Sequence, residues 1–202
     1  MKISHLAYHI IEKYASVDGG ITPLKLQKLL YYTNVWGLVS GQLTVSGQFK
    51  AWKNGPVNGY IYSKYKKYGD QPIPVENEAG PISSAKKELI TFILESYVHF
   101  DAVTLSAMTH EEEPWEATPK NEVIGDEFIK QYYSTLAFAK NFPVQTDKPY
   151  YPVYTDFMYS FIFDFQEGDE AKEVVFDSFD EYKQMMKQSK KELNNIISLE
   201  PA

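Results

Sequence analysis

One long helix is the sequence feature that most constrains the fold. In the segment "TPLKLQKLLYYTNVWGLVSG", Thr22 is suited to cap a helix, Pro23 to occupy its first position and Gly41 to follow its end. Apolar side chains fall on more than one side of this helix, so a single neighbouring element is too little to cover them. We therefore predict a central helix surrounded by others, in a chain whose 202 residues are enough to build one core.

Apolar residues at helical spacing predict the surrounding elements. The pattern recurs in five further segments: residues 4–15, 57–68, 83–100, 101–113 and 126–141. With the central helix, they predict a mainly α fold, in which residues 1–142 form a compact domain of about five to six helices.

The composition changes after residue 142. Residues 143–154 are punctuated by prolines and are predicted to be a linker. Residues 155–202 predict a small ββα extension, with strands at 157–165 and 173–176 and a helix at 178–197. Because a hairpin and one helix bury little apolar surface, we expect the extension to dock on the helical domain or on a partner.

The stretch "FKAWKNGPVNGYIYSKYKKYG", residues 49–69, contains five lysines, four tyrosines and no acidic residue. Such a mixture is found where proteins bind nucleic acids, but its apolar residues also keep a helical period. We predict a short extended piece at residues 49–52, a turn, and a helix that begins at Pro56 and ends at Gly69.

An amphipathic helix is the favoured interpretation of this stretch. Tyr60, Ile61 and Tyr65 would then face the core while the lysines face water. The alternative is a nucleic-acid-binding regulator that uses the surface from Lys50 to Lys67. All twenty basic residues are lysines, so the arginine fork that grips phosphates is missing, and the net charge of the chain is −7. We therefore expect no specific DNA binding.

No pattern of catalytic or metal-binding residues is complete. The chain has no cysteine, and His5 and His9 lie four residues apart without a carboxylate at the spacing that would complete a metal site. His110 precedes glutamates 111–113, which we interpret as the solvated end of a helix. No phosphate-binding loop or nucleophile elbow occurs. We expect a protein without enzymatic activity, cofactor or metal. Because no apolar run is long enough for a membrane span, we also expect no membrane partner and a cytoplasmic location.

Three segments, taken together, resemble a known family. They are "ITPLKLQKLLYYTNVWGL", "FKAWKNGPVNGYIYSKYKKYG" and "LSAMTHEEEPWEAT", and their order and spacing are similar to those of the Panacea domain, the SocA-like antitoxin family of bacterial toxin–antitoxin systems. The resemblance covers roughly residues 1–142. It implies a mostly helical domain that neutralises a toxin encoded beside it, largely by direct contact, and that occurs on prophages and mobile elements. It implies no catalytic residues.

Two groups of residues are candidates for binding the toxin. Lys53, Asn54 and Asn58 are polar residues of the middle segment and are expected to be exposed beside it. The aromatic residues Phe161, Phe163 and Phe165 alternate along the first predicted strand of the extension. One face of that strand is either free for a partner or packed against the helical domain, and the sequence favours neither. The sequence also leaves the stoichiometry open, and a homo-oligomer is among the alternatives.

Overall fold

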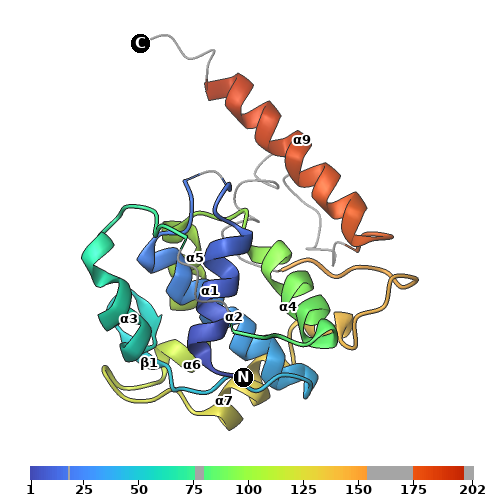
Figure 1. Ribbon diagram of the computed structural model, residues 1–202. Helices are drawn as coiled ribbons and strands as arrows, with labels where there is room; N and C mark the ends of the chain where they lie inside the picture. Colours follow the sequence, from blue (N-terminus) through green and yellow to red (C-terminus); the bar gives the residue numbers. More distant parts are fainter. Residues whose placement is uncertain (18, 76–79, 154–174, 198–202) are drawn as a thin grey trace.

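A single helix, α2 (Pro23–Ser40), forms the centre of the protein. The computed structural model describes residues 1–17, 19–75, 80–153 and 175–197. The helices that pack most extensively against α2 (Figure 1) are α1 (Ile3–Lys13), α4 (Ser84–Tyr97), α5 (Ala102–His110) and α7 (Asp126–Tyr133). The prediction of a mainly α fold with a surrounded central helix is confirmed.

The ends of α2 are set by the residues that the sequence indicated. The hydroxyl oxygen of Thr22 accepts a hydrogen bond from the backbone N–H of Lys25 at 3.3 Å. At the other end, Gly41 adopts a left-handed conformation with φ of 68°, which a glycine adopts without steric cost. Between these ends the helix is buried on nearly all sides, including its polar residues Gln27 and Lys28.

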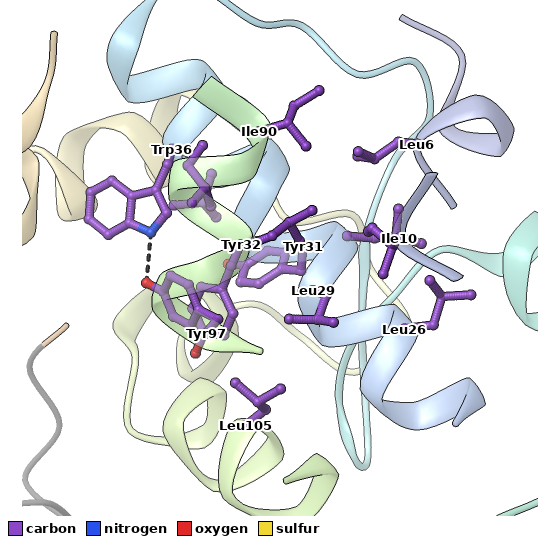
Figure 2. Close-up of a cluster of buried hydrophobic side chains, with 14 of the residues drawn as sticks. Leu6, Ile10, Leu26, Leu29, Tyr31, Tyr32, Trp36, Ile90, Tyr97 and Leu105 are labelled. Atoms are coloured by element: carbon purple, nitrogen blue, oxygen red, sulfur yellow. Dashed lines mark hydrogen bonds between the residues drawn. The ribbon is translucent and has the colours of Figure 1, made fainter. Parts of the chain in front are cut away.

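Aromatic residues fill the centre of the core (Figure 2). The ring N–H of Trp36 on α2 donates to the hydroxyl of Tyr97 on α4 at 2.7 Å. The ring of Tyr32 stacks on that of Tyr97, with centroids 4.2 Å apart. On the side of α2 that faces α1, Leu6 and Ile10 complete the packing. Each buried aromatic hydroxyl or N–H named here thus has a partner, as buried polar atoms require.

The lysine and tyrosine stretch begins with a hairpin. Strand β1 (Lys50–Trp52) pairs antiparallel with β2 (Gly55–Val57). The extended piece at 49–52 is therefore confirmed, but the helix does not begin at Pro56, which lies opposite Ala51 in the hairpin. The helix α3 (Gly59–Tyr65) begins three residues later because Asn58 provides the side-chain cap, and a 3-10 helix, η1 (Lys66–Tyr68), follows it.

Tyr60, Ile61 and Tyr65 of α3 were predicted to face the core, and two of the three do so. Ile61 and Tyr65 are buried, as expected. Tyr60 is 60% exposed, so that part of the prediction is wrong. A helix that begins at Gly59 has Tyr60 in its first turn, and α3 packs by one side only, against α1 and α2. The outer side of α3 faces solvent, with Lys66 and Lys67 exposed as expected.

Two predicted helices are shorter than expected. The helix from residue 101 ends at His110 and a separate turn, α6 (Glu113–Glu116), follows. The helix predicted at 126–141 ends at Tyr133, and a 3-10 helix, η2 (Ala137–Asn141), takes its place. Phe138 of η2 is buried with its ring 4.7 Å from that of Trp36. This packing outweighs the local preference for one continuous helix.

The C-terminal helix α9 (Phe179–Ile197) begins against the helical body and then extends away from it (Figure 1). Tyr182 is buried, and the ring of Phe179 lies 5.5 Å from that of Phe92 on α4. Phe176 forms an isolated antiparallel bridge with Tyr150. The strand predicted at 157–165, with Phe161, Phe163 and Phe165, lies outside the described residues, as do residues 173 and 174. The division at residues 142 and 154 stays a prediction.

Among the described helices, no single one has the length and apolarity that a membrane span requires. Helices α4 and α5 meet the criterion only as a pair bent by 95°.

Truncation of Tyr65 tests whether α3 belongs to the core. We expect Tyr65→Ala to lower the free energy of unfolding by about 3–5 kcal/mol, because it leaves a cavity beneath α3. The exposed Tyr60 gives the matched control, and Tyr60→Ala should change stability by no more than about 0.5 kcal/mol. Denaturant unfolding measures both, and equal losses in the two variants would show that α3 is not packed as described.

Candidate partner-binding face

The turn of the hairpin is held by three consecutive backbone carbonyls. The carbonyl oxygen of Trp52 accepts from the ring N–H of Trp115 at 3.0 Å. That of Lys53 lies 2.9 Å from Nε2 of His110, and that of Asn54 accepts from the hydroxyl of Ser106 at 2.9 Å. Helices α5 and α6 thus fix the turn from below while the side chains of Lys53 and Asn54 are exposed.

His110 connects the turn to the end of α5. Its Nδ1 lies 2.5 Å from the carbonyl oxygen of Ser106, and its Nε2 faces the carbonyl of Lys53. Carbonyl oxygens only accept hydrogen bonds, so a ring nitrogen that carries a proton donates to the carbonyl that faces it. The ring of Trp115 lies against that of His110, with centroids 4.0 Å apart. The contact of His110 with Trp115 therefore serves to anchor the turn.

Gly55 allows the hairpin to approach α2. Its φ of 95° lies in the region that favours glycine. A methyl group added at this position would overlap the ammonium of Lys28 and the hydroxyl of Thr109. The ammonium of Lys28 instead donates to the carbonyl oxygen of Pro56 at 3.2 Å. The glycine of the "NGPV" segment is thus required by a buried lysine beneath it.

Asn58 is a structural residue, and the expectation that it is exposed is wrong. The backbone N–H of Asn58 donates to the side-chain oxygen of Gln27 at 2.8 Å, and the amide of Gln27 returns a bond to the carbonyl of Asn58 at 3.3 Å. The side chain of Asn58 caps α3 through the N–H of Ile61 and donates to the carbonyl of Gln48. Asn58 is therefore buried because its backbone and side chain join the hairpin to α2.

A second buried polar cluster lies where α5 meets α6. The carboxyl group of Glu112 accepts from the hydroxyl of Tyr32 on α2 at 3.0 Å and from the hydroxyl of Tyr133 on α7. The hydroxyls of Tyr31 and Tyr133 are 3.4 Å apart. Part of Glu112 remains at the surface, but its carboxyl group points inward. The expectation that all three glutamates 111–113 are solvated is wrong for Glu112, because tyrosine hydroxyls supply buried donors for it.

Burial shifts the ionisation of this cluster. Burial raises the pKa of Glu112 to about 8, although its hydrogen bonds to Tyr133 and Tyr32 oppose the shift. Burial also lowers the pKa of Lys28 to about 7, against the attraction of Glu112. Near neutral pH both groups are therefore partly uncharged, which is how the core accommodates them.

The structure brings together two of the three residues predicted from the middle segment. We call the hairpin turn of residues 52–54, whose carbonyls are held by α5 and α6, the anchored turn. Lys53 and Asn54 lie side by side on it, whereas Asn58 lies beneath it. Gln27, Lys28 and Glu112 were not identified as site-forming residues. The signal for the first two was present in the sequence, since polar residues inside a helix that is apolar on several sides must be buried.

Metal-ligating side chains do not gather near this face in the part of the chain that the structure describes. Among the described residues, no group of three histidines, aspartates or glutamates is close enough to share a metal ion. His9, one member of the helical pair considered above, has a pKa lowered by burial and by Lys13. The exposed side chains of Lys53 and Asn54 are carried by a backbone that is fixed. This arrangement is suited to contact with another molecule.

Substitution of Gly55 tests the close approach of the hairpin to α2. We expect Gly55→Ala to lower the free energy of unfolding by about 2–5 kcal/mol, from the strained φ and the overlap with Lys28. Gly59 is the control, because an added methyl group there meets nothing within 4 Å. Gly59→Ala should leave stability unchanged or raise it by up to about 1 kcal/mol. A thermal unfolding series in which both variants behave alike would contradict the role given to Gly55.

The pKa of Glu112 predicts a pH dependence. Its folded pKa lies above its ordinary value, so its stabilising effect is complete in acid and is lost as pH rises toward about 8. Glu112→Gln resembles the protonated form, and should become more stable relative to the wild type as pH rises from about 5 to 8. Glu111→Gln, at an exposed neighbour, should show no such trend. A wild-type-to-Glu112→Gln difference that stays constant across this range would contradict the burial of the carboxyl group.

Part of the chain is similar to known proteins. Residues 26–116 match the family model described as "Antitoxin SocA-like, Panacea domain". Antitoxin SocA of Caulobacter vibrioides (strain NA1000 / CB15N) is 40% identical over 65 residues, which are 32% of this chain and 35% of that protein. The chain thus matches about a third of this curated relative's length. No solved structure matches. The matched residues run from α2 to α6 and include the whole anchored turn, so this part of the chain is similar to the Panacea domain of SocA-like antitoxins.

Proposed function

We propose that this protein is an antitoxin that neutralises a protein toxin by binding it directly. In this proposal the toxin is encoded beside the antitoxin and both act in the cytoplasm. The antitoxin works by occupying the toxin and not by catalysis, so no cofactor or metal takes part.

The observation that carries the proposal is the family match and its position. The match to the SocA-like Panacea domain covers residues 26–116, which contain most of α2 together with the hairpin, α3, α4, α5 and α6. A relative with 40% identity over 65 residues bears the name Antitoxin SocA. The side chains that this region exposes on the anchored turn, Lys53 and Asn54, are the first candidates for toxin contact.

The anchored turn is suited to direct binding. Its backbone is fixed by Trp115, His110 and Ser106, so little conformational entropy is lost when a partner binds it. The side chains that the turn exposes are not the ones that hold the fold, so they can be substituted while the domain stays folded. In the proposal, the anchored turn supplies a contact that does not depend on which toxin is bound.

The C-terminal extension is proposed to adjust which toxin is bound. Residues 155–202 contain the aromatic residues Phe161, Phe163 and Phe165, which are the proposed contacts in this part of the chain. Tyr182 is buried in the body, so removal of the whole extension would damage the fold as well as any contact. Substitution of single phenylalanines is therefore the better way to examine this part.

Coexpression tests the proposal. The product of each adjacent open reading frame is induced in cells with and without the full-length chain. We expect one product to arrest growth and the chain to restore it, with the two proteins eluting together in size-exclusion chromatography. Lys53→Glu should weaken the rescue, whereas Lys86→Glu, at an exposed lysine on α4, should rescue like the wild type.

Two results would contradict the proposal. If no adjacent product is toxic, or if the chain does not relieve toxicity, the protein is not an antitoxin of that kind. If growth is restored while the purified proteins do not associate, neutralisation does not occur by direct binding. The elution volume of a complex would also give its stoichiometry, including any self-association.

A further inference from the structure

The outer side of α3 exposes the aromatic rings of Tyr60 and Tyr62. We define the α3 outer face as Tyr60, Tyr62 and Ser63 of α3 together with Lys66 and Lys67 of the adjoining η1, all of which are exposed. Among the described residues six large apolar side chains are exposed, and the two aromatic ones are Tyr60 and Tyr62, at 60% and 40%. The inner side of the same helix is fully packed through Ile61 and Tyr65. The outer rings therefore contribute little to the core.

The α3 outer face is held in place by the anchored turn. The ring of Tyr62 lies edge to face against the ring of Trp52, with centroids 4.9 Å apart. Trp52 is the residue whose carbonyl accepts from Trp115, and Asn58 caps the start of α3. The face is thus continuous with the turn that exposes Lys53. Figure 1 shows this region on the side of the body opposite α4 and α9.

The charge of the α3 outer face is positive, since its charged residues are the exposed lysines Lys66 and Lys67. Residues 49–69 include no acidic residue. None of the ion pairs between described residues involves Lys53, Lys66 or Lys67. The ammonium of Lys66 instead lies 5.9 Å from the ring of Tyr62. Lysines next to aromatic rings attract carboxylates while the rings supply apolar contact area.

The surroundings of the face distinguish a protein partner from a nucleic acid. Beyond the anchored turn, the exposed glutamates 111, 113 and 116 lie beside His110 and Trp115. A run of phosphates laid across Lys53 would meet these negative charges, and residues 71–202 carry a net charge of −13. The chain also has no arginine to grip a phosphate in the bidentate manner. A protein can place acidic residues opposite the lysines and avoid the glutamates.

We propose that the α3 outer face docks an acidic segment of a partner protein, with carboxylates at Lys66 and Lys67 and apolar contact at Tyr60 and Tyr62. If the proposed function holds, that partner is the toxin. The charge complementarity on which the docking rests belongs to this surface, so it can be tested without the toxin.

The test uses the full-length chain and two labelled probes of equal length, a glutamate decapeptide and a deoxythymidine decanucleotide. Fluorescence anisotropy at low salt measures both. We expect the peptide to bind, and Lys66→Glu with Lys67→Glu to weaken this binding by at least about tenfold. Lys86→Glu with Lys87→Glu is the matched control, because these lysines are also adjacent and exposed but lie on α4. It should bind like the wild type.

Tyr62→Ala separates apolar contact from charge. It should weaken binding of the peptide while leaving the salt dependence unchanged, since no charge is removed. Circular dichroism confirms that each variant is folded, and Lys66→Gln with Lys67→Gln replaces the charge reversal if that variant is not. The proposal is overturned if the peptide does not bind, if both lysine pairs weaken binding equally, or if the decanucleotide binds more tightly through the same lysines.

The product of the adjacent open reading frame separates this proposal from the proposed function. If that product does not bind but the peptide binds through Lys66 and Lys67, the antitoxin function is wrong and the acidic docking site stands. If that product binds equally well to the wild type and to the Lys66→Glu, Lys67→Glu variant, the antitoxin function stands and the docking site is wrong.

Discussion

Three buried polar side chains of α2 hold the candidate binding face in position. This face consists of the anchored turn, with Lys53 and Asn54, and of the α3 outer face. Gln27 pairs with the backbone of Asn58, the ammonium of Lys28 donates to the carbonyl of Pro56, and the hydroxyl of Tyr32 donates to the carboxyl of Glu112. These contacts attach the hairpin and the α5–α6 junction to the central helix. Apolar packing alone would tolerate several positions of these loops, whereas a buried donor that must meet one acceptor specifies a single position.

This arrangement separates the residues that hold the fold from those that are free to contact a partner. Below the turn, Lys28 and Glu112 are buried and partly uncharged near neutral pH. Above it, Lys53, Asn54 and the outer side of α3 are exposed. A domain built in this way can keep its frame while its exposed residues change.

The sequence predicted the central helix well and the candidate binding face less well. Thr22 and Gly41 end α2 through local backbone chemistry, which a sequence pattern records directly. Asn58 was expected to be exposed and Glu112 to be solvated, yet both are held by side chains distant along the chain, such as Gln27 and Tyr133. Such pairings depend on which helices meet, and a single sequence does not record that. Lys53 was placed correctly because turns are exposed.

The central claim is that buried polar contacts of α2 position the face, and amide hydrogen exchange of a Lys28→Met variant tests it most directly. Methionine fills the space of the lysine stem but leaves the carbonyl of Pro56 without its donor. We predict faster exchange in residues 50–58 and unchanged exchange in α4, while the protein remains folded. Unchanged exchange in residues 50–58, or an equal increase throughout the chain, would contradict the account.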